Sequence, residues 1–285
     1  MLFYLKTKNK TNLKLLLIIS ILITSLTFTS SAQNYTYALF PGDTALLVFD
    51  KSYDSTIWQK SKDSISWTDI AGATDSTLQV ITDTSYTKKY YFRVKNIDTT
   101  ECRLSAFYST TIVHRVLDSL HQVQVGDWFH GGVVFYTYST GHGLIAPTSD
   151  QSSSCEWGCY GTAIGSSAQS LSDGKSNTAA IVNYHDSIGY YNNPTQCNQY
   201  NDGTVAAKLC DTISINGYED WYLPAKNELN YLYQKKTLVG GFSRYGYWSS
   251  SEYNAYYAWR QYFGNGGQYY TYKYYYNRVR CIRSY

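Results

Sequence analysis

The last 41 residues, 245–285, carry the side chains best suited to chemistry at a surface, because 13 of them are tyrosine in a chain that holds 32 tyrosines. Tyrosine presents a large rigid ring and a hydroxyl, and only two side-chain torsions must be ordered on contact. Four or five such rings would cover the ~800 Å² that one partner contributes to a standard interface. The chemistry indicated is therefore non-covalent recognition.

These tyrosines fill the gaps of a frame with a different character. The frame comprises Trp248, Ser249 to Glu252, Trp259, Phe263, Gly266, Gln268, Lys273 and Val279 to Arg283. The candidate ligand-binding residues are those in the gaps: Tyr253, Asn254, Tyr256, Tyr257, Arg260, Tyr262, Asn265, Tyr269, Tyr270, Tyr272, Tyr274, Tyr275 and Tyr276. Because tyrosine is also a good strand former, plain β-structure or a self-associating segment is the alternative interpretation.

The segment is locally basic, and its cations have two expected roles. Arg260 and Lys273 flank tyrosines, where they would favour an anionic glycan or an acidic protein surface. The terminal arginines are expected to be structural, paired with Glu252 or with backbone carbonyls: Arg278, Arg280 and Arg283.

The spacing of the cysteines bears on two possibilities, metal binding and disulfides. The six cysteines are Cys102, Cys155, Cys159, Cys197, Cys210 and Cys281. The pairs 155/159 and 197/210 loosely resemble zinc spacing, but no histidine lies at a matching distance. Disulfides are therefore favoured over zinc, with at least one cysteine free or paired with Cys102, and neither a metal nor a cofactor is expected.

Catalytic arrangements are weak in this chain. Its five histidines are scattered, and no HExxH motif or glycine-flanked nucleophile occurs. His142 lies between two glycines and is expected in a turn. Asp220 and Glu228 are expected at a strand end and at an early helix position, where the helix dipole favours an acid. We therefore expect no enzymatic activity.

The N-terminus predicts export. Four lysines among the first 14 residues, an apolar run over 15–28 and small residues at Ser30 to Ala32 are typical of a secretory signal peptide over 1–32. The run is short for a membrane anchor, which is the alternative. The formal net charge of +3 less these four lysines is −1 for the remaining chain, so a nucleic-acid partner is not expected. No other segment is long and apolar enough to span a membrane.

Residues 34–116 alternate short β-type runs with turn residues, which favours an all-β sandwich. Strands are expected over 45–49, 56–60, 66–70, 77–81, 90–96 and 108–114. The phrases IWQKSKDSISWTDIAGATDSTLQV and YYFRVKN resemble immunoglobulin-like modules of exported bacterial surface proteins, with Trp58 as the core tryptophan. The intersheet cysteine pair of antibody domains is missing. The resemblance implies a spacer.

A short linker over 117–124 precedes a region, 125–285, of mixed composition. Two β-runs surround a turn at 139–143, and apolar residues have helical spacing over 177–184 and 205–213. Pro224 is expected to open a third helix that ends at Gly240 and Gly241. Strands, helices and again strands indicate an α+β domain.

Ordered blocks in this region carry a family resemblance: GDWFHGGVVFY, GHGLIAPTSDQ, CEWGCYGT, SNTAAIV, AAKLC, DWYLPAKNELNYLY, YWSSSEYN and VRCIR. Together they resemble the C-terminal domain of a bacterial collagen-like adhesin (Lcl), over 125–285. The resemblance implies a C-type-lectin-like fold with its ligand-binding face on the gap residues. Calcium-type sugar motifs are absent. Sulfatase-activating oxidases share the fold, but nothing here marks a reactive cysteine.

The tyrosine-rich segment is also similar to the variable repeats of proteins diversified by retroelements, in which adenine-rich Asn codons become Tyr and other codons. Asn254, Asn265 and Asn277 remain beside the tyrosines. We expect a secreted or cell-surface adhesin or receptor that binds a protein or glycan on another cell, a phage or a host surface. The alternative is a structural surface or matrix protein that self-associates through the tyrosines.

Overall fold

The computed structural model describes residues 4–6, 36–40, 44–48, 55–81, 89–98, 105–109, 111–117, 123–139 and 141–285. The chain is mostly β-structure with a few helices, and it divides into two compact units, residues 1–116 and 117–285. Most of the expected signal peptide and linker, together with Cys102, lies outside the described residues.

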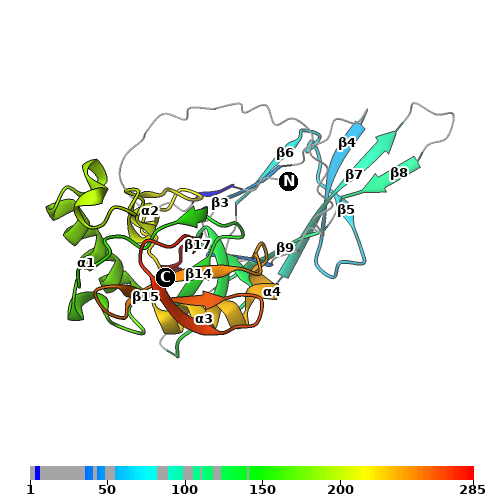
Figure 1. The fold of residues 1–285 in the computed structure, drawn as a ribbon. Coiled ribbons are helices and arrows are strands. Elements are labelled where there is room, and N and C mark those ends of the chain that lie inside the picture. Colours follow the sequence, from blue (N-terminus) through cyan, green and yellow to red (C-terminus); the bar gives the residue numbers. More distant parts are fainter. Residues whose placement is uncertain are drawn as a thin grey trace. The chain divides into compact units, whose positions relative to one another are not determined.

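The N-terminal unit is all β in its described part (Figure 1). One sheet has the order β1-β3-β6, formed by Tyr4–Lys6, Thr44–Val48 and Thr77–Ile81. The other has the order β2-β9-β7-β4-β5, formed by Thr36–Leu39, Ile112–Val116, Lys89–Asp98, Ser55–Ser61 and Thr68–Asp69. A further strand, β8 at Ser105–Tyr108, pairs with β7.

Trp58 of β4 is fully buried, as expected for a core tryptophan, and its indole N–H donates to the carbonyl oxygen of Asp75 at 2.9 Å. Most of the expected strands are confirmed within one or two residues. The single strand expected over 108–114 is wrong, because the chain ends β8 at Tyr108 and starts β9 at Ile112. The Ser109 hydroxyl accepts a hydrogen bond from the Val94 N–H at this break, which ties the turn to β7.

The C-terminal unit contains two sheets. The first has the order β18-β12-β11-β10, formed by Arg283–Ser284, Gly143–Ala146, Gly132–Thr137 and Asp127–Phe129. The second has the order β13-β17-β14-β15-β16, formed by Ser152–Cys155, Asn277–Val279, Gly246–Glu252, Tyr257–Tyr262 and Gln268–Tyr272. Because β18 pairs with β12, the last residues of the chain return to the strands that open the unit.

Among the described residues of this unit, four α-helices accompany these sheets: α1 at Gly174–Ser187, α2 at Ala206–Thr212, α3 at Lys226–Gln234 and α4 at Lys236–Val239. Helices α1 and α2 lie side by side, and α3 lies along β15 (Figure 1). Short 3₁₀ turns η2, η3 and η4 occupy Ser166–Ala168, Tyr190–Asn192 and Pro194–Gln196.

The helix expected between Pro224 and Gly240 is present but begins later and is broken. It starts at Lys226 because the carboxylate of Glu228 accepts the N–H of Ala225 and so satisfies a free donor of the first turn. The chain then breaks at Lys235 between α3 and α4. Gly241 follows with φ +70°, and a Cβ there would overlap the carbonyl oxygen of Thr148, so the turn needs glycine.

The core of the unit is built from aromatic residues and closed by disulfides. Trp157 and Trp248 are fully buried, and their indole N–H groups donate to the carbonyl oxygens of Ser249 and Cys155 at 2.9 and 2.8 Å. Disulfides join Cys159 to Cys197 and Cys210 to Cys281. The expectation of disulfides is confirmed. Cys155 is a free, buried thiol.

Candidate ligand-binding site

The candidate residues lie on β15, on β16 and on the loops beside these strands. The two strands pair antiparallel over five consecutive residues, from Tyr257 opposite Tyr272 to Gln261 opposite Gln268. Because alternate residues of a strand point to the same face, Tyr257 shares one face with Tyr270 and Tyr272. Ala258 points to the other face and belongs to the core.

Burial divides the terminal segment into frame and gaps. The frame residues Trp248, Ser249 to Glu252 and Lys273 are buried, whereas none of the thirteen candidate residues is. The most exposed of the candidate tyrosines, at 45% to 54%, are Tyr253, Tyr256, Tyr269, Tyr270, Tyr275 and Tyr276. The gaps are therefore free to contact a partner. Trp259 is the exception among the frame aromatics, since it is only half-buried.

The exposed rings contact one another. Tyr253 stacks on Tyr270 with 4.3 Å between ring centroids, and Trp259 meets both rings edge-on at 5.5 and 5.7 Å. Tyr257 lies against Tyr272 at 4.8 Å and against Tyr270 at 5.4 Å. Such pairs contribute about 0.5–1.5 kcal/mol each beyond the area they bury, so the rings hold one another in place.

The network continues beyond the strands. Tyr272 contacts Tyr274 and Tyr275 at 5.4 and 5.3 Å. Tyr160, from a distant loop, lies 4.8 Å from Tyr274 and 5.3 Å from Tyr256. We call this surface the aromatic face: Tyr160, Tyr200, Tyr253, Tyr256, Tyr257, Trp259, Tyr270, Tyr272, Tyr274 and Tyr275.

Tyr160 and Tyr200 are not among the residues predicted from the sequence, and they come from two loops outside the terminal segment. Tyr200 lies 5.2 Å from Tyr274. Each follows a cysteine of the same disulfide, Cys159 or Cys197, by one or three residues. That proximity was visible in the sequence, but the pairing that brings the two loops together was not.

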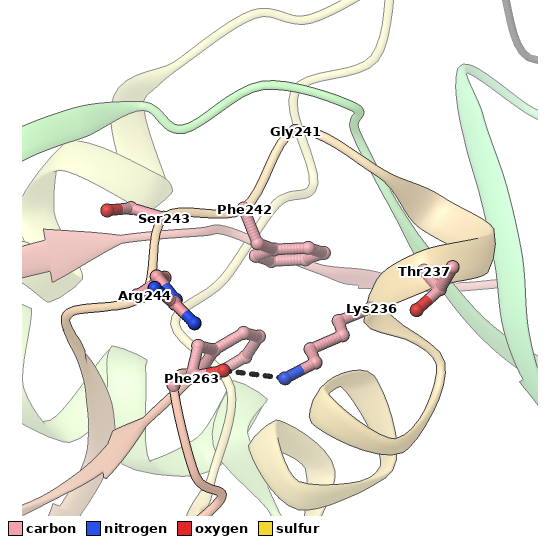
Figure 2. Close-up of a pocket in the computed structure, with 8 residues that line it drawn as sticks. Lys236, Thr237, Gly241, Phe242, Ser243, Arg244 and Phe263 are labelled. Atoms are coloured by element: carbon pink, nitrogen blue, oxygen red, sulfur yellow. Dashed lines mark hydrogen bonds between the residues drawn. The ribbon is translucent and has the colours of Figure 1, made fainter.

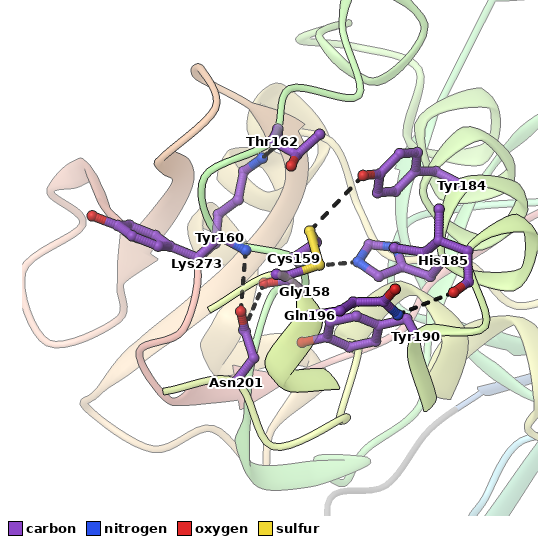
Figure 3. The surroundings of a disulfide bond; sticks show 12 residues. Gly158, Cys159, Tyr160, Thr162, Tyr184, His185, Tyr190, Gln196, Asn201 and Lys273 are labelled. Atoms are coloured by element: carbon purple, nitrogen blue, oxygen red, sulfur yellow. Dashed lines mark hydrogen bonds between the residues drawn. A yellow bond between two sulfur atoms is a disulfide. The ribbon is translucent and has the colours of Figure 1, made fainter. Parts of the chain in front are cut away.

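The Cys159–Cys197 disulfide and its surroundings fix both loops beneath the aromatic face (Figure 3). The Asn201 side chain accepts the N–H of Tyr160 at 3.3 Å and donates to the carbonyl oxygen of Gly158 at 3.1 Å. Buried His185 accepts the N–H of Cys159 at 2.8 Å through Nε2. Because burial lowers the pKa of His185 to about 4, this ring nitrogen stays an acceptor at neutral pH.

Two further candidates support the aromatic face through hydrogen bonds. The Tyr276 hydroxyl donates to a carboxylate oxygen of Asp202 at 3.0 Å, which ties the 274–276 turn to the loop of Tyr200. The Asn254 side chain accepts the N–H groups of Tyr256 and Tyr257 and so shapes the loop before β15.

Four candidates lie elsewhere. Alternation places Arg260, Tyr262 and Tyr269 on the opposite face of the β15–β16 ribbon from Tyr257 and Tyr270. Asn265 is in the connecting turn, where its side chain accepts the N–H of Gly267. Arg260 donates to the Asn277 side chain at 3.1 Å. The aromatic face thus excludes Arg260, Tyr262, Asn265 and Tyr269.

The expectation that Lys273 attracts an anionic ligand is wrong. Its ammonium and the carboxylate of Glu252 form a fully buried ion pair at 2.6 Å. Glu252 also accepts the N–H groups of Ile164 and Gly165, and Lys273 donates to the carbonyl oxygen of Thr162. Lys273 is therefore part of the scaffold under the turn.

The structural role expected for the terminal arginines is confirmed. Arg280 and Arg283 donate to backbone carbonyls as expected, whereas the other expected partner, Glu252, does not pair with them. Arg280 and Arg278 pair with Asp150 at 2.6 and 3.0 Å, and Arg283 pairs with Asp220 at 2.6 Å. Glu252 is unavailable to them because Lys273 occupies it. Arg280 also donates to the carbonyl oxygens of Pro147, Gly240 and Gly241.

A cavity of about 330 Å³ lies apart from the candidate residues, between α4 and the end of β15 (Figure 2). Its lining residues are Lys236, Thr237, Gly241, Phe242, Ser243, Arg244, Phe263 and Gly264. The Lys236 ammonium donates to the carbonyl oxygen of Phe263 at 2.6 Å, so this cation already has a hydrogen-bond partner in the wall of the cavity.

The described residues offer little for covalent or metal chemistry. Burial raises the pKa of the Cys155 thiol to about 12, which keeps it protonated and a poor nucleophile at neutral pH. Within the described ranges, no three or more His, Cys, Asp or Glu side chains are grouped to hold a metal ion. No helix in the same ranges is both long and apolar enough to cross a membrane.

Comparisons with known families agree with this geometry. Residues 148–283 match the family of the Lcl C-terminal domain. The C-terminal unit contains an Lcl C-terminal domain. Residues 24–117 match a domain of unknown function (DUF8696). A search of curated proteins finds no match.

The Lcl domain match contains the whole candidate site and both disulfides. It begins after β12, although the resemblance in the sequence starts at Val125. The strands between these points still belong to the same unit, because β12 pairs with β18 at its C-terminal end. All residues of the aromatic face lie within the residues that match the Lcl C-terminal domain.

Proposed function

We propose that this protein is an exported adhesin or receptor that binds a protein or glycan ligand through the aromatic face of its Lcl domain. The observation that carries the proposal is the connected set of exposed rings, from Tyr253 on one side to Tyr160 and Tyr200 on the other. Amphipathic rings that pack against one another and still expose part of their surface to solvent are typical of recognition surfaces. Two disulfides fit an extracellular location.

Pre-ordering supports binding over a passive surface. Rings that already contact one another lose little conformational freedom when a ligand arrives, so more of the contact energy appears as affinity. The buried Lys273–Glu252 pair and the Cys159–Cys197 disulfide hold the loops from below. The proposal assigns no catalytic step to the protein.

The finer parts of the proposal rest on the sequence resemblances. A signal peptide over 1–32 would export the chain, an immunoglobulin-like N-terminal unit would act as a spacer, and the Lcl domain would have a C-type-lectin-like fold. Retroelement diversification of the gap residues is supported by the partition between buried frame and accessible gaps. Sequencing this locus and its flanking DNA in several isolates tests that point, since diversification requires codon changes confined to adenines of a nearby template repeat.

Self-association is the second candidate function. It is favoured by one observation, namely that β16 forms an edge of its sheet and is rich in tyrosine. Sedimentation of the purified chain at several concentrations separates the two candidates: a surface whose role is to bind a different molecule leaves the protein monomeric, whereas a matrix role gives assemblies that grow with concentration.

The direct test compares two triple variants of the mature chain, residues 33–285, on arrays of surface proteins and glycans and on intact cells. Tyr253→Ala, Tyr270→Ala and Tyr275→Ala remove exposed rings of the aromatic face. The matched control combines Tyr108→Ala, Tyr138→Ala and Tyr245→Ala, which remove three exposed rings outside the aromatic face.

Loss of one to three hot-spot rings commonly weakens binding by about 2 kcal/mol or more, close to thirtyfold. We expect that loss in the first variant and wild-type binding in the control. Equal binding by the two variants would refute the assignment of the ligand to the aromatic face.

A further inference from the structure

The outer edge of β16 is an open hydrogen-bonding edge beside the aromatic face. In the sheet order β13-β17-β14-β15-β16 this strand is terminal. At one end of the β15–β16 ladder the Lys273 N–H donates to the Tyr256 carbonyl oxygen, and at the other end the Tyr262 N–H donates to the Gly267 carbonyl oxygen. These two bonds show which residues of β16 turn their peptide groups towards β15. Alternation then directs the peptide groups of Gln268, Tyr270 and Tyr272 away from β15.

This edge lacks the usual protection. Natural edge strands are blunted by Lys, Pro or a bulge. The strand β16 reads QYYTY, and its register with β15 is regular over all five pairs. By contrast, the β14–β15 and β13–β17 ladders both contain register shifts. Of the outward groups, the Tyr272 carbonyl accepts the N–H of Tyr275, whereas no hydrogen bond among the described residues involves the Tyr270 N–H or C=O. Tyr270 as a whole is 49% exposed.

A cation without a carboxylate partner lies at the start of the same strand. The Lys226 ammonium lies 3.4 Å from the centroid of the Trp259 ring. The Gln268 side chain donates to the Lys226 carbonyl oxygen at 2.9 Å, which fixes this residue beside β16. None of the ion pairs among the described residues includes Lys226. A carboxylate on an incoming peptide would form an ion pair with the Lys226 ammonium.

We propose that the ligand of the aromatic face is an extended acidic peptide segment, which adds to β16 as a further antiparallel or parallel strand and places a carboxylate on Lys226. Backbone bonds to Gln268 and Tyr270 would supply affinity, and the rings of Tyr253 and Tyr270 would contact alternate side chains. This inference rests on the proposed function, because it places the ligand on the same surface. A second copy of the chain fits less well, since its β16 brings no carboxylate to Lys226.

The test begins with random linear 12-residue peptides displayed on phage and panned against the mature chain. We expect the recovered peptides to share an acidic residue within a strand-forming sequence. Each peptide bond of one synthetic binder is then N-methylated in turn. Because a backbone hydrogen bond contributes about 0.5–1.5 kcal/mol, methylation should weaken binding about three- to tenfold at every second residue and leave the residues between unaffected.

Protein variants give the matching result. Tyr270→Ala removes the ring, whereas Tyr270→Pro removes the ring and the outward N–H, so the proline variant should bind about threefold or more below the alanine variant. Lys226→Gln should weaken binding of the acidic peptide and have little effect on the same peptide with its acid changed to an amide. Lys235→Gln, an exposed lysine at the other end of α3, is the control.

Several outcomes overturn the inference. Failure to recover peptides, an N-methylation pattern without a period of two, or a dimer that Tyr270→Pro dissolves would each do so. If a glycan binds and the aromatic-face variant loses it, the proposed function stands and the peptide inference fails. If neither peptides nor arrayed ligands depend on the aromatic face, both fail.

Discussion

Lys273→Met tests whether the buried ion pair, rather than the tyrosines, holds the terminal segment in its fold. The substitution leaves the Glu252 carboxylate in a site where both partners are 0% exposed, with only the N–H groups of Ile164 and Gly165 as donors. Breaking a buried pair in this way typically costs about 3–5 kcal/mol, since the remaining charge is uncompensated. We expect a loss of that size from the Lcl domain.

The assay is hydrogen exchange of the β14 and β15 amides, which reports opening of the Lcl domain separately from the N-terminal unit. Glu252→Gln combined with Lys273→Met removes both charges and should cost less than Lys273→Met alone. A loss below about 1 kcal/mol in the single variant, or a double variant worse than the single, would refute the reasoning.

The remaining predictions concern the disulfides and two buried titratable groups. Replacing Cys159 and Cys197 by Ser should weaken ligand binding per folded molecule, because the two loops that carry Tyr160 and Tyr200 are no longer linked. Replacing Cys210 and Cys281 by Ser is the control, which should lower stability but leave binding unchanged. Ligand titration of each variant measures the difference. Burial lowers the pKa of His114 to about 4, so the contribution of the neutral ring to stability is complete above pH 6.5 and is lost as the pH falls towards 4. The loss should reach about 3 kcal/mol in melts of the N-terminal unit. His114→Phe should flatten this pH dependence. Burial raises the pKa of Glu228 to about 7, so the contribution of this carboxyl group to stability falls as the pH rises from 4.5 through 7. In denaturant titrations the wild type should therefore lose unfolding free energy relative to Glu228→Gln over that pH range.

Local signals predicted much of the architecture. Short β-type runs separated by turn residues predicted the strands around Trp58, and helical spacing of apolar residues predicted α1 and α2 within three residues of their observed ends. The break between α3 and α4 at Lys235 escaped notice, because no glycine or proline marks that point in the sequence.

Pairings between distant residues explain the errors in the site. Lys273 looked like a ligand-facing cation because tyrosines flank it, yet the alternation of the turn points it inward to Glu252. The terminal arginines pair with Asp150 and Asp220, which lie 128 and 63 residues away from Arg278 and Arg283. Tyr160 and Tyr200 joined the aromatic face only through the Cys159–Cys197 pairing, which composition does not specify.

The separation of frame from gaps has an energetic consequence that can be measured residue by residue. Trp248 and Lys273 are fully buried, whereas Tyr253 and Tyr275 are about half exposed and contact other rings of the aromatic face. Removing a half-exposed ring loses part of its burial and one or two ring contacts, about 1 kcal/mol, whereas truncating buried Trp248 costs about 3–5 kcal/mol.

An alanine scan of 245–285, read by denaturant titration, should therefore give two separate groups, with the frame above about 2 kcal/mol and the gaps near 1. A surface of this kind can change its side chains while the Lcl domain stays folded, which is the physical requirement for diversification. A scan in which Tyr253 or Tyr275 costs as much as Trp248 would mean that the tyrosines are part of the core. The tyrosines would then be required for folding, so their side chains could not vary to bind different ligands.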